Sequence, residues 1–157
     1  MIFVFDTNSL SNILRNYFPE TFSSFWRQFG ALIENKAITS VREVKGELEE
    51  KFDKTLIGRF EIYCPDFFTI PSLEELRFIP QIYAIKHFQQ NLDRKKILKG
   101  GNFADPFVIA KAKIIKGIVV TEETFKEHAA KIPNICHHFN VGYLNLENFL
   151  KTQKWNY

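Results

Sequence analysis

This sequence of 157 residues lacks any apolar run long enough to cross a membrane. Its apolar stretches are short, residues 68–70 being typical, whereas a transmembrane helix needs about 20 residues. No basic region precedes the first apolar residues, because residues 1–5 lead directly into Asp6. We therefore expect neither a signal peptide nor a membrane segment.

Cysteine is also scarce. The two cysteines, Cys64 and Cys136, lie far apart in the chain and form no CxxC pair, which favours a reduced, cytoplasmic protein. Residues 136–138 (Cys-His-His) contain possible zinc ligands, but no second ligand cluster with zinc-like spacing accompanies them. We expect structural roles for these three residues.

The sequence has little excess of either charge: it contains 21 Lys and Arg and 18 Asp and Glu, which gives a net charge of +3. This total does not indicate a nucleic-acid partner. The distribution is uneven, however: residues 41–75 hold five basic and nine acidic side chains, and residues 84–116 hold eight and two. Apolar residues are plentiful, at 45% with 17 Phe, which is enough for the core of one domain.

Short apolar runs alternate with helical patterns along the chain. Strands are predicted at residues 2–5, 37–39, 67–70, 118–120 and 141–146. Helices are predicted at residues 9–17, 19–35, 41–52, 53–64, 72–92, 105–116 and 147–151, with Ser40 and Ser72 as N-caps. This alternation is typical of an α/β fold whose central sheet is mostly parallel.

Acidic residues follow the two most apolar strands. Asp6 comes directly after residues 2–5, and Glu122 and Glu123 come shortly after residues 118–120. Open α/β sheets place their sites at this edge, and carboxylates that converge there repel one another unless a cation lies between them. Mg²⁺ and Mn²⁺ prefer oxygen ligands, so the pattern predicts a site for such a cation.

Three further acids could join this edge. Asp105 opens a predicted helix, and Glu43 and Glu47 lie four residues apart on one face of another. Taken singly, every one of these acids could instead cap a helix, favour a helix N-terminus or pair with a neighbouring lysine. Those structural interpretations explain less well why acids follow both fully apolar strands.

Four short segments resemble, in order, the acidic motifs of the PIN-domain family. They are Val4–Asn8, Val44–Leu48, Ala104–Ala110 and Val119–Glu123. The resemblance spans nearly the whole chain and is closest to the small, toxin-type (VapC-like) PIN ribonucleases. It implies a three-layer α/β/α sandwich with a mostly parallel central sheet of four to five strands, formed by residues 1–157 as a single domain.

The resemblance also implies an activity, namely Mg²⁺- or Mn²⁺-dependent hydrolysis of RNA phosphodiesters by the toxin of a toxin–antitoxin pair. The acids at the motif positions would be catalytic residues and metal ligands: Asp6, Glu47, Asp105 and Glu123. Asn8 and Thr121 match supporting polar positions, and Glu122 and Glu43 are the alternative acids. An antitoxin protein and a second copy of the chain are the protein partners that the resemblance implies.

RNA contacts are predicted in the basic loop that precedes Asp105. Metal held by the acids would activate a water molecule and neutralise charge on the phosphate, while the loop would follow the RNA backbone. The residues predicted to bind RNA are Arg94, Lys95, Lys96 and Lys99. A solvated polar loop without this role is the alternative.

Three other functions compete with this one. A haloacid-dehalogenase-type phosphatase needs a second Asp two positions after the first, where this chain has Asn8. Gly100–Gly101 forms neither GxGxxG nor a P-loop, which argues against a nucleotide-binding protein. A degenerate PIN module that binds RNA or protein without cleavage is the alternative that the sequence leaves open.

Overall fold

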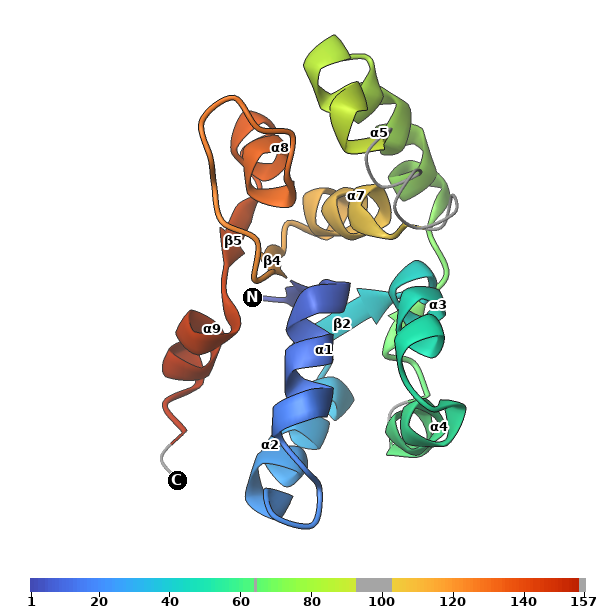
Figure 1. The fold of residues 1–157 in the computed structure, drawn as a ribbon, viewed down its shortest axis with the longest axis vertical. Helices are drawn as coiled ribbons and strands as arrows, with labels where there is room; N and C mark the ends of the chain where they lie inside the picture. Colours follow the sequence, from blue (N-terminus) through green and yellow to red (C-terminus); the bar gives the residue numbers. More distant parts are fainter. Residues whose placement is uncertain (64, 93–102, 156–157) are drawn as a thin grey trace.

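Five parallel strands form the central sheet of the computed structural model, which describes residues 1–63, 65–92 and 103–155 (Figure 1). The strands are β1 (Phe3–Phe5), β2 (Ile38–Val41), β3 (Phe68–Thr69), β4 (Ile118–Val120) and β5 (Gly142–Leu144). Their order is β3-β2-β1-β4-β5, and each strand pairs in parallel with its neighbours. The predicted α/β class and parallel sheet are confirmed.

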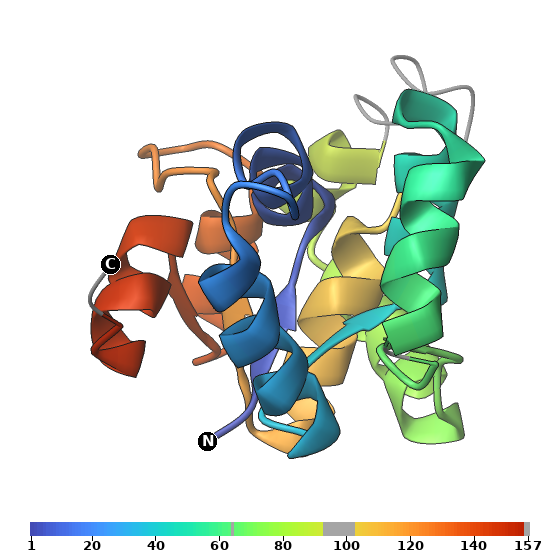
Figure 2. The same ribbon diagram turned by 90° about the horizontal axis from the view of Figure 1, so that it is seen from below.

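Helices cover both faces of the sheet and complete a three-layer α/β/α sandwich (Figures 1 and 2). One layer contains α1 (Thr7–Asn16), α2 (Ser23–Glu34), α3 (Arg42–Lys51), α4 (Lys54–Tyr63) and α9 (Leu146–Gln153). The other contains α5 (Leu73–Tyr83), the 3-10 helix η1 (Lys86–Phe88), α7 (Asp105–Ile115) and α8 (Ile132–His138). Over the ranges that the structure describes, no helix combines the length and apolar character needed to cross a membrane.

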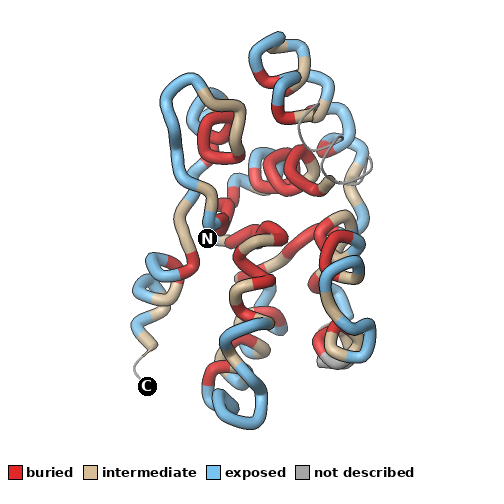
Figure 3. The backbone as a smooth tube through the Cα atoms, viewed as in Figure 1, coloured by how far each residue is buried: buried red, intermediate tan, exposed pale blue. Residues whose placement is uncertain are grey.

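Strand β1 is buried on both faces, as its all-apolar sequence predicts for a central parallel strand. The ring centroids of Phe3 and Phe5 each lie 5.0 Å from that of Phe149 in α9, and Phe5 also packs on Phe29 in α2. Between them, Val4 is fully buried. Figure 3 shows buried segments gathered in β1, α1 and α7, so the strand that directly precedes Asp6 lies at the centre of the core.

One predicted helix cap is wrong. Ser40 does not cap α3 but lies in β2, where its hydroxyl donates a hydrogen bond to the Phe5 carbonyl oxygen at 2.7 Å. Val41 therefore takes the N-cap position of α3, without a capping side chain. The hydroxyl that the sequence assigns to a helix end instead links two neighbouring strands.

The helix predicted over residues 72–92 ends earlier. Ser72 caps α5 as predicted, since its hydroxyl oxygen accepts a hydrogen bond from the Glu75 amide at 3.1 Å. The helix stops at Tyr83, whose carbonyl oxygen accepts from the Gln89 side-chain amide at 2.9 Å. A side chain thus satisfies a carbonyl group at the helix end. Residues 89–92 are again helical.

Gly117 links α7 to β4 where no side chain fits. A Cβ atom there would lie 2.7 Å from the Ile2 carbonyl oxygen, which is held by the Ile118 amide at 2.9 Å. Replacing Gly117 by Ala is therefore expected to lower the free energy of unfolding, measured in urea, by about 1–3 kcal/mol. Gly46 in α3, with open space around it, is the control, and its change to Ala should stabilise by about 0.5–1 kcal/mol. A Gly117→Ala protein as stable as the wild type would contradict this account.

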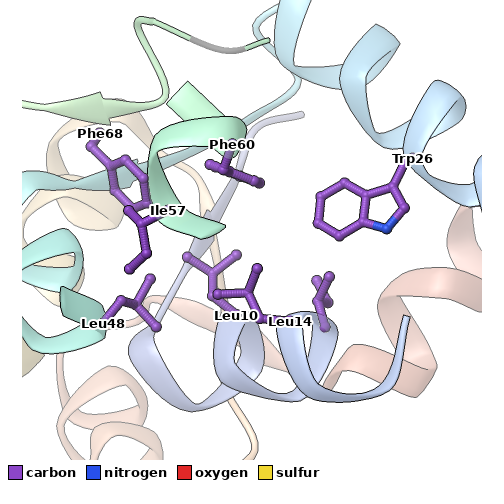
Figure 4. A pocket seen from close by; sticks show the side chains of 8 residues that line it. Leu10, Leu14, Trp26, Leu48, Ile57, Phe60 and Phe68 are labelled. Atoms are coloured by element: carbon purple, nitrogen blue, oxygen red, sulfur yellow. The ribbon is translucent and has the colours of Figure 1, made fainter. Parts of the chain in front are cut away.

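A small apolar pocket lies between α1, α2, α3 and α4 (Figure 4). Leu10, Leu48 and Phe60 are among the side chains that line it, and Trp26 closes one end. Its cavity volume is about 10 Å³, roughly the space that one water molecule needs. The pocket is a gap in the packing of the helical layer and offers no polar group to a ligand.

Candidate functional site

The strand order creates a switch point between β1 and β4, where the connections that follow these two strands run in opposite directions on opposite faces of the sheet. Asp6 follows β1 and Thr121 follows β4 at this point. The Asp6 amide donates to the Val120 carbonyl oxygen at 3.0 Å, so the two strand ends are joined. In open α/β sheets, ligands bind in the crevice at this place.

The carboxylate of Asp6 is buried and accepts three hydrogen bonds. The Ser9 amide and hydroxyl donate to Oδ1 at 2.8 and 2.7 Å, and the Thr121 hydroxyl donates to Oδ2 at 2.6 Å. Asp6 therefore caps α1, as predicted by the alternative interpretation in which these acids cap helices. Burial raises the pKa of Asp6 from 3.8 to about 7, against the lowering effect of the Thr121 and Ser9 hydrogen bonds and with a further increase from Asp105.

Glu47, in α3, lies between the segments that carry Asp6 and Asp105. Its Oε2 accepts a hydrogen bond from the Thr7 hydroxyl at 3.2 Å, and its Oε1 accepts from the Ala104 amide at 3.1 Å. Thr7 directly follows Asp6, and Ala104 directly precedes Asp105. Through these two contacts Glu47 connects the chain next to Asp6 with the chain next to Asp105, and all three acids are buried.

Asp105 is the first residue of α7 and does not cap that helix. The N-cap position belongs to Ala104, which has no capping side chain. The carboxylate of Asp105 accepts a hydrogen bond at Oδ2 from the side-chain amide of Asn91 at 3.1 Å. The structural interpretation of Asp105 as an N-cap is therefore wrong, and its buried carboxylate requires another explanation.

The two acids after β4 have different partners. Glu122 Oε1 accepts from the Leu146 amide at 2.8 Å, at the start of α9, whereas Glu123 Oε2 accepts from the Ile132 amide at 2.9 Å, at the start of α8. The Glu123 amide also donates to the Thr121 hydroxyl oxygen at 3.1 Å. Glu123 is therefore tied to the residue that holds Asp6, and Glu122 is directed to a different helix.

The charges of the acids affect the pKa of the buried Cys136 thiol. Burial, followed by the fields of Asp105, Glu123 and Asp6, raises the pKa of its thiol. The geometric link between Glu123 and Asp6 is Thr121, whose hydroxyl donates to Asp6 Oδ2 and accepts from the Glu123 amide. A thiol that resists ionisation is consistent with the structural role expected for Cys136.

The remaining predicted residues contribute in different ways. Glu43, at the start of α3, forms an ion pair with Arg42 at 3.1 Å, and its Oε2 is buried without a hydrogen-bond partner among the described residues. Asn8 is partly exposed, and Ser9 rather than Asn8 holds Asp6. The four residues of the predicted RNA-binding loop lie outside the described residues: Arg94, Lys95, Lys96 and Lys99.

Comparison with known protein families matches residues 3–157 to the family described as Domain of unknown function (DUF4411). The chain belongs to the DUF4411 family. No curated protein and no solved structure matches it. The acids of the candidate site all lie within the matched part of the DUF4411 domain.

In the described part of this DUF4411 domain, no three His, Cys, Asp or Glu side chains form a group that could hold a metal ion. The acids are instead connected through intervening donors, such as Thr121 between Asp6 and Glu123. The donor set nevertheless has the chemistry that Mg²⁺ and Mn²⁺ prefer, because the three buried carboxyl groups, connected through the contacts of Glu47, supply oxygen atoms.

Sequence reasoning missed the side chains that hold the acids of this DUF4411 domain. Ser9 had a detectable signal, since a residue three positions after an Asp N-cap commonly supplies the capped amide. Asn91 and Tyr83 had none. Asn91 contacts Asp105 across 14 residues of chain, and Tyr83 contacts Asn91 from the end of α5, so no local pattern connects them.

Proposed function

We propose that this DUF4411 protein is a metal-dependent endoribonuclease that hydrolyses RNA phosphodiesters. The observation that supports the proposal is the burial of Asp6, Glu47 and Asp105 together, near the carboxyl edge of the sheet at its switch point. A buried carboxylate destabilises a protein unless a cation or hydrogen-bond donors offset its charge, and the pKa of Asp6 reflects this cost, since burial raises it most and the charge of Asp105 raises it further. Glu123 is the fourth acid of the proposed site.

Mg²⁺ or Mn²⁺ bound by these acids would supply Lewis acidity and a water molecule of lowered pKa. The chain's own residues hold the acids in place. Thr121 and Ser9 fix both oxygen atoms of Asp6, and Thr7 with the Ala104 amide fixes those of Glu47. Carboxylates oriented in this way lose little side-chain entropy when a cation binds.

The resemblance to toxin-type PIN ribonucleases extends the proposal. It makes the protein the cytoplasmic toxin of a toxin–antitoxin pair, with one PIN-like domain over residues 1–157 and RNA contacts from the loop at residues 94–99. An antitoxin, and a second copy of the chain, would be its protein partners. Exposed Phe18, Phe22 and Phe125 support this part, because partners commonly cover large apolar side chains.

A second candidate is a degenerate PIN module that binds RNA or protein without cleaving it. Two hydrogen bonds favour it. Glu123 Oε2 accepts from the Ile132 amide, and Glu47 Oε1 accepts from the Ala104 amide, so each carboxylate already has a structural role. In this candidate the acids would organise helix ends rather than hold a cation.

Cleavage of a mixed RNA pool tests both candidates. Wild-type protein should cleave with Mg²⁺ or Mn²⁺ and lose this activity in EDTA, and Asp105→Asn should be reduced to the EDTA level. Glu127→Gln is the matched control, because Glu127 is 85% exposed and should retain wild-type activity. Activity that survives EDTA or Asp105→Asn would overturn the metal mechanism, and RNA binding without cleavage would support the second candidate.

A further inference from the structure

We propose that Asn91 is a positioning residue for Asp105, held in its own orientation by Tyr83. The inference rests on the proposed function and deepens it. Tyr83 is the last residue of α5, Asn91 lies in the helical residues 89–92, and Asp105 is the first residue of α7. Three separate elements thus contribute to one chain of hydrogen bonds.

The chain has a defined direction. The Tyr83 hydroxyl donates to Asn91 Oδ1 at 3.1 Å, and Asn91 Nδ2 donates to Asp105 Oδ2 at 3.1 Å. If the amide were turned over, its carbonyl oxygen would face the carboxylate and its NH₂ group would face the phenol. A carboxylate only accepts hydrogen bonds, so the orientation with the NH₂ group toward Asp105 is the one that suits a carboxylate.

Burial makes this arrangement selective. Asn91 is only 4% exposed, and a buried amide is costly unless both of its ends are hydrogen-bonded. Burial, together with the charge of Asp105, also raises the pKa of Tyr83, so the phenol keeps its proton and remains a donor. An apolar residue in place of Asn91 would fill the space, but it would leave Asp105 without this donor.

The contact acts on one oxygen atom of the carboxylate. Asn91 approaches Oδ2 and thereby limits rotation of the Asp105 side chain. Hydrogen-bond donors behind metal-binding carboxylates typically change metal affinity by about 10–100-fold when they are removed. Asn91 is accordingly expected to affect the metal concentration that the protein requires more than its overall fold.

The experiment measures the Mn²⁺ concentration for half-maximal RNA cleavage and, independently, Mn²⁺ binding by calorimetry. Asn91→Leu and Asn91→Asp should both raise the half-saturating Mn²⁺ concentration by about 10–100-fold. Asn91→Asp keeps the shape but replaces the donor by an acceptor. Tyr83→Phe removes one hydroxyl group and should produce a smaller increase in the same direction, which keeps the test valid if an Asn91 variant does not fold.

Ile33→Val controls for lost stability, because Ile33 is a buried core residue of α2, in the other helical layer, and its change should leave Mn²⁺ dependence unaltered. If wild-type protein binds Mn²⁺ and cleaves RNA while the Asn91 and Tyr83 variants show wild-type Mn²⁺ dependence, the positioning role is wrong and the proposed function stands. If wild-type protein neither binds Mn²⁺ nor cleaves, both fail.

Discussion

Replacing Asp6 by Asn is expected to abolish metal-dependent RNA cleavage and, at the same time, to stabilise the metal-free protein at pH 8. The carboxylate is buried at the end of β1, and burial raises its pKa to about 7. Above that pH the folded protein carries a buried negative charge. Asn removes the charge, retains an oxygen atom that accepts from Ser9, and offers its NH₂ group to the Thr121 hydroxyl.

The pH dependence follows from the direction of this shift. Between about pH 4 and pH 7 the folded protein keeps a proton on Asp6 that the unfolded chain releases, so the free energy of unfolding falls as the pH rises. Above pH 7 the loss is complete and amounts to about 4 kcal/mol at most. Asp6→Asn should recover a large part of it at pH 8 and clearly less, about 1–2 kcal/mol at most, at pH 5.

Urea denaturation of the metal-free proteins at the two pH values provides the measurement. Glu127→Gln is again the control, because Glu127 is exposed and the loss of its carboxylate should not change the free energy of unfolding through burial. Mn²⁺ should then raise the melting temperature of the wild type and leave that of Asp6→Asn unchanged. An Asp6→Asn protein that is less stable than the wild type at pH 8, or that still cleaves RNA, would contradict these expectations.

The opposite effects of one substitution on stability and activity illustrate a general cost of functional sites. A protein that gathers acids for a cation is destabilised by those acids when no cation is bound. Net charge conceals this: Asp6, Glu47 and Asp105 count as negative residues in a total of +3. Their burial, which the net charge does not record, distinguishes them from the acids on the surface.

Glu47 and Asp105 were singled out by their places on predicted helices and by the resemblance to PIN domains. Local sequence patterns predicted the strands and the acids that follow them, because an apolar run followed by an acid marks both the strand and its carboxyl end. β1 with Asp6 is the clearest case. Features that depend on side chains far apart in the sequence were not predictable. Ser40 resembles a helix cap but donates to the Phe5 carbonyl oxygen of β1, and Asn91 meets Asp105 only because the helical residues 89–92 lie beside the start of α7.

Removing the buried lysine of α7 is expected to cost more stability than the other substitutions within the fold. Lys111 Nζ lies 3.8 Å from Glu75 Oε1 in α5, with the two side chains only 10% and 5% exposed. Glu75 Oε2 has no hydrogen-bond partner among the described residues. Lys111→Met would leave the Glu75 charge buried without its cation, which typically lowers the free energy of unfolding by about 3–5 kcal/mol.

Replacing both residues separates the contribution of the ion pair to the free energy of unfolding from the destabilisation caused by an isolated buried charge. Glu75→Leu together with Lys111→Met replaces both charges by apolar side chains of similar size, and such replacements are often neutral or stabilising. The double variant should therefore be more stable in urea than Lys111→Met alone and close to the wild type. A Lys111→Met protein within about 1 kcal/mol of the wild type would show that solvent reaches Glu75 in the folded state. A double variant no more stable than the single one would show that the pair itself, rather than the isolated charge, holds α5 against α7.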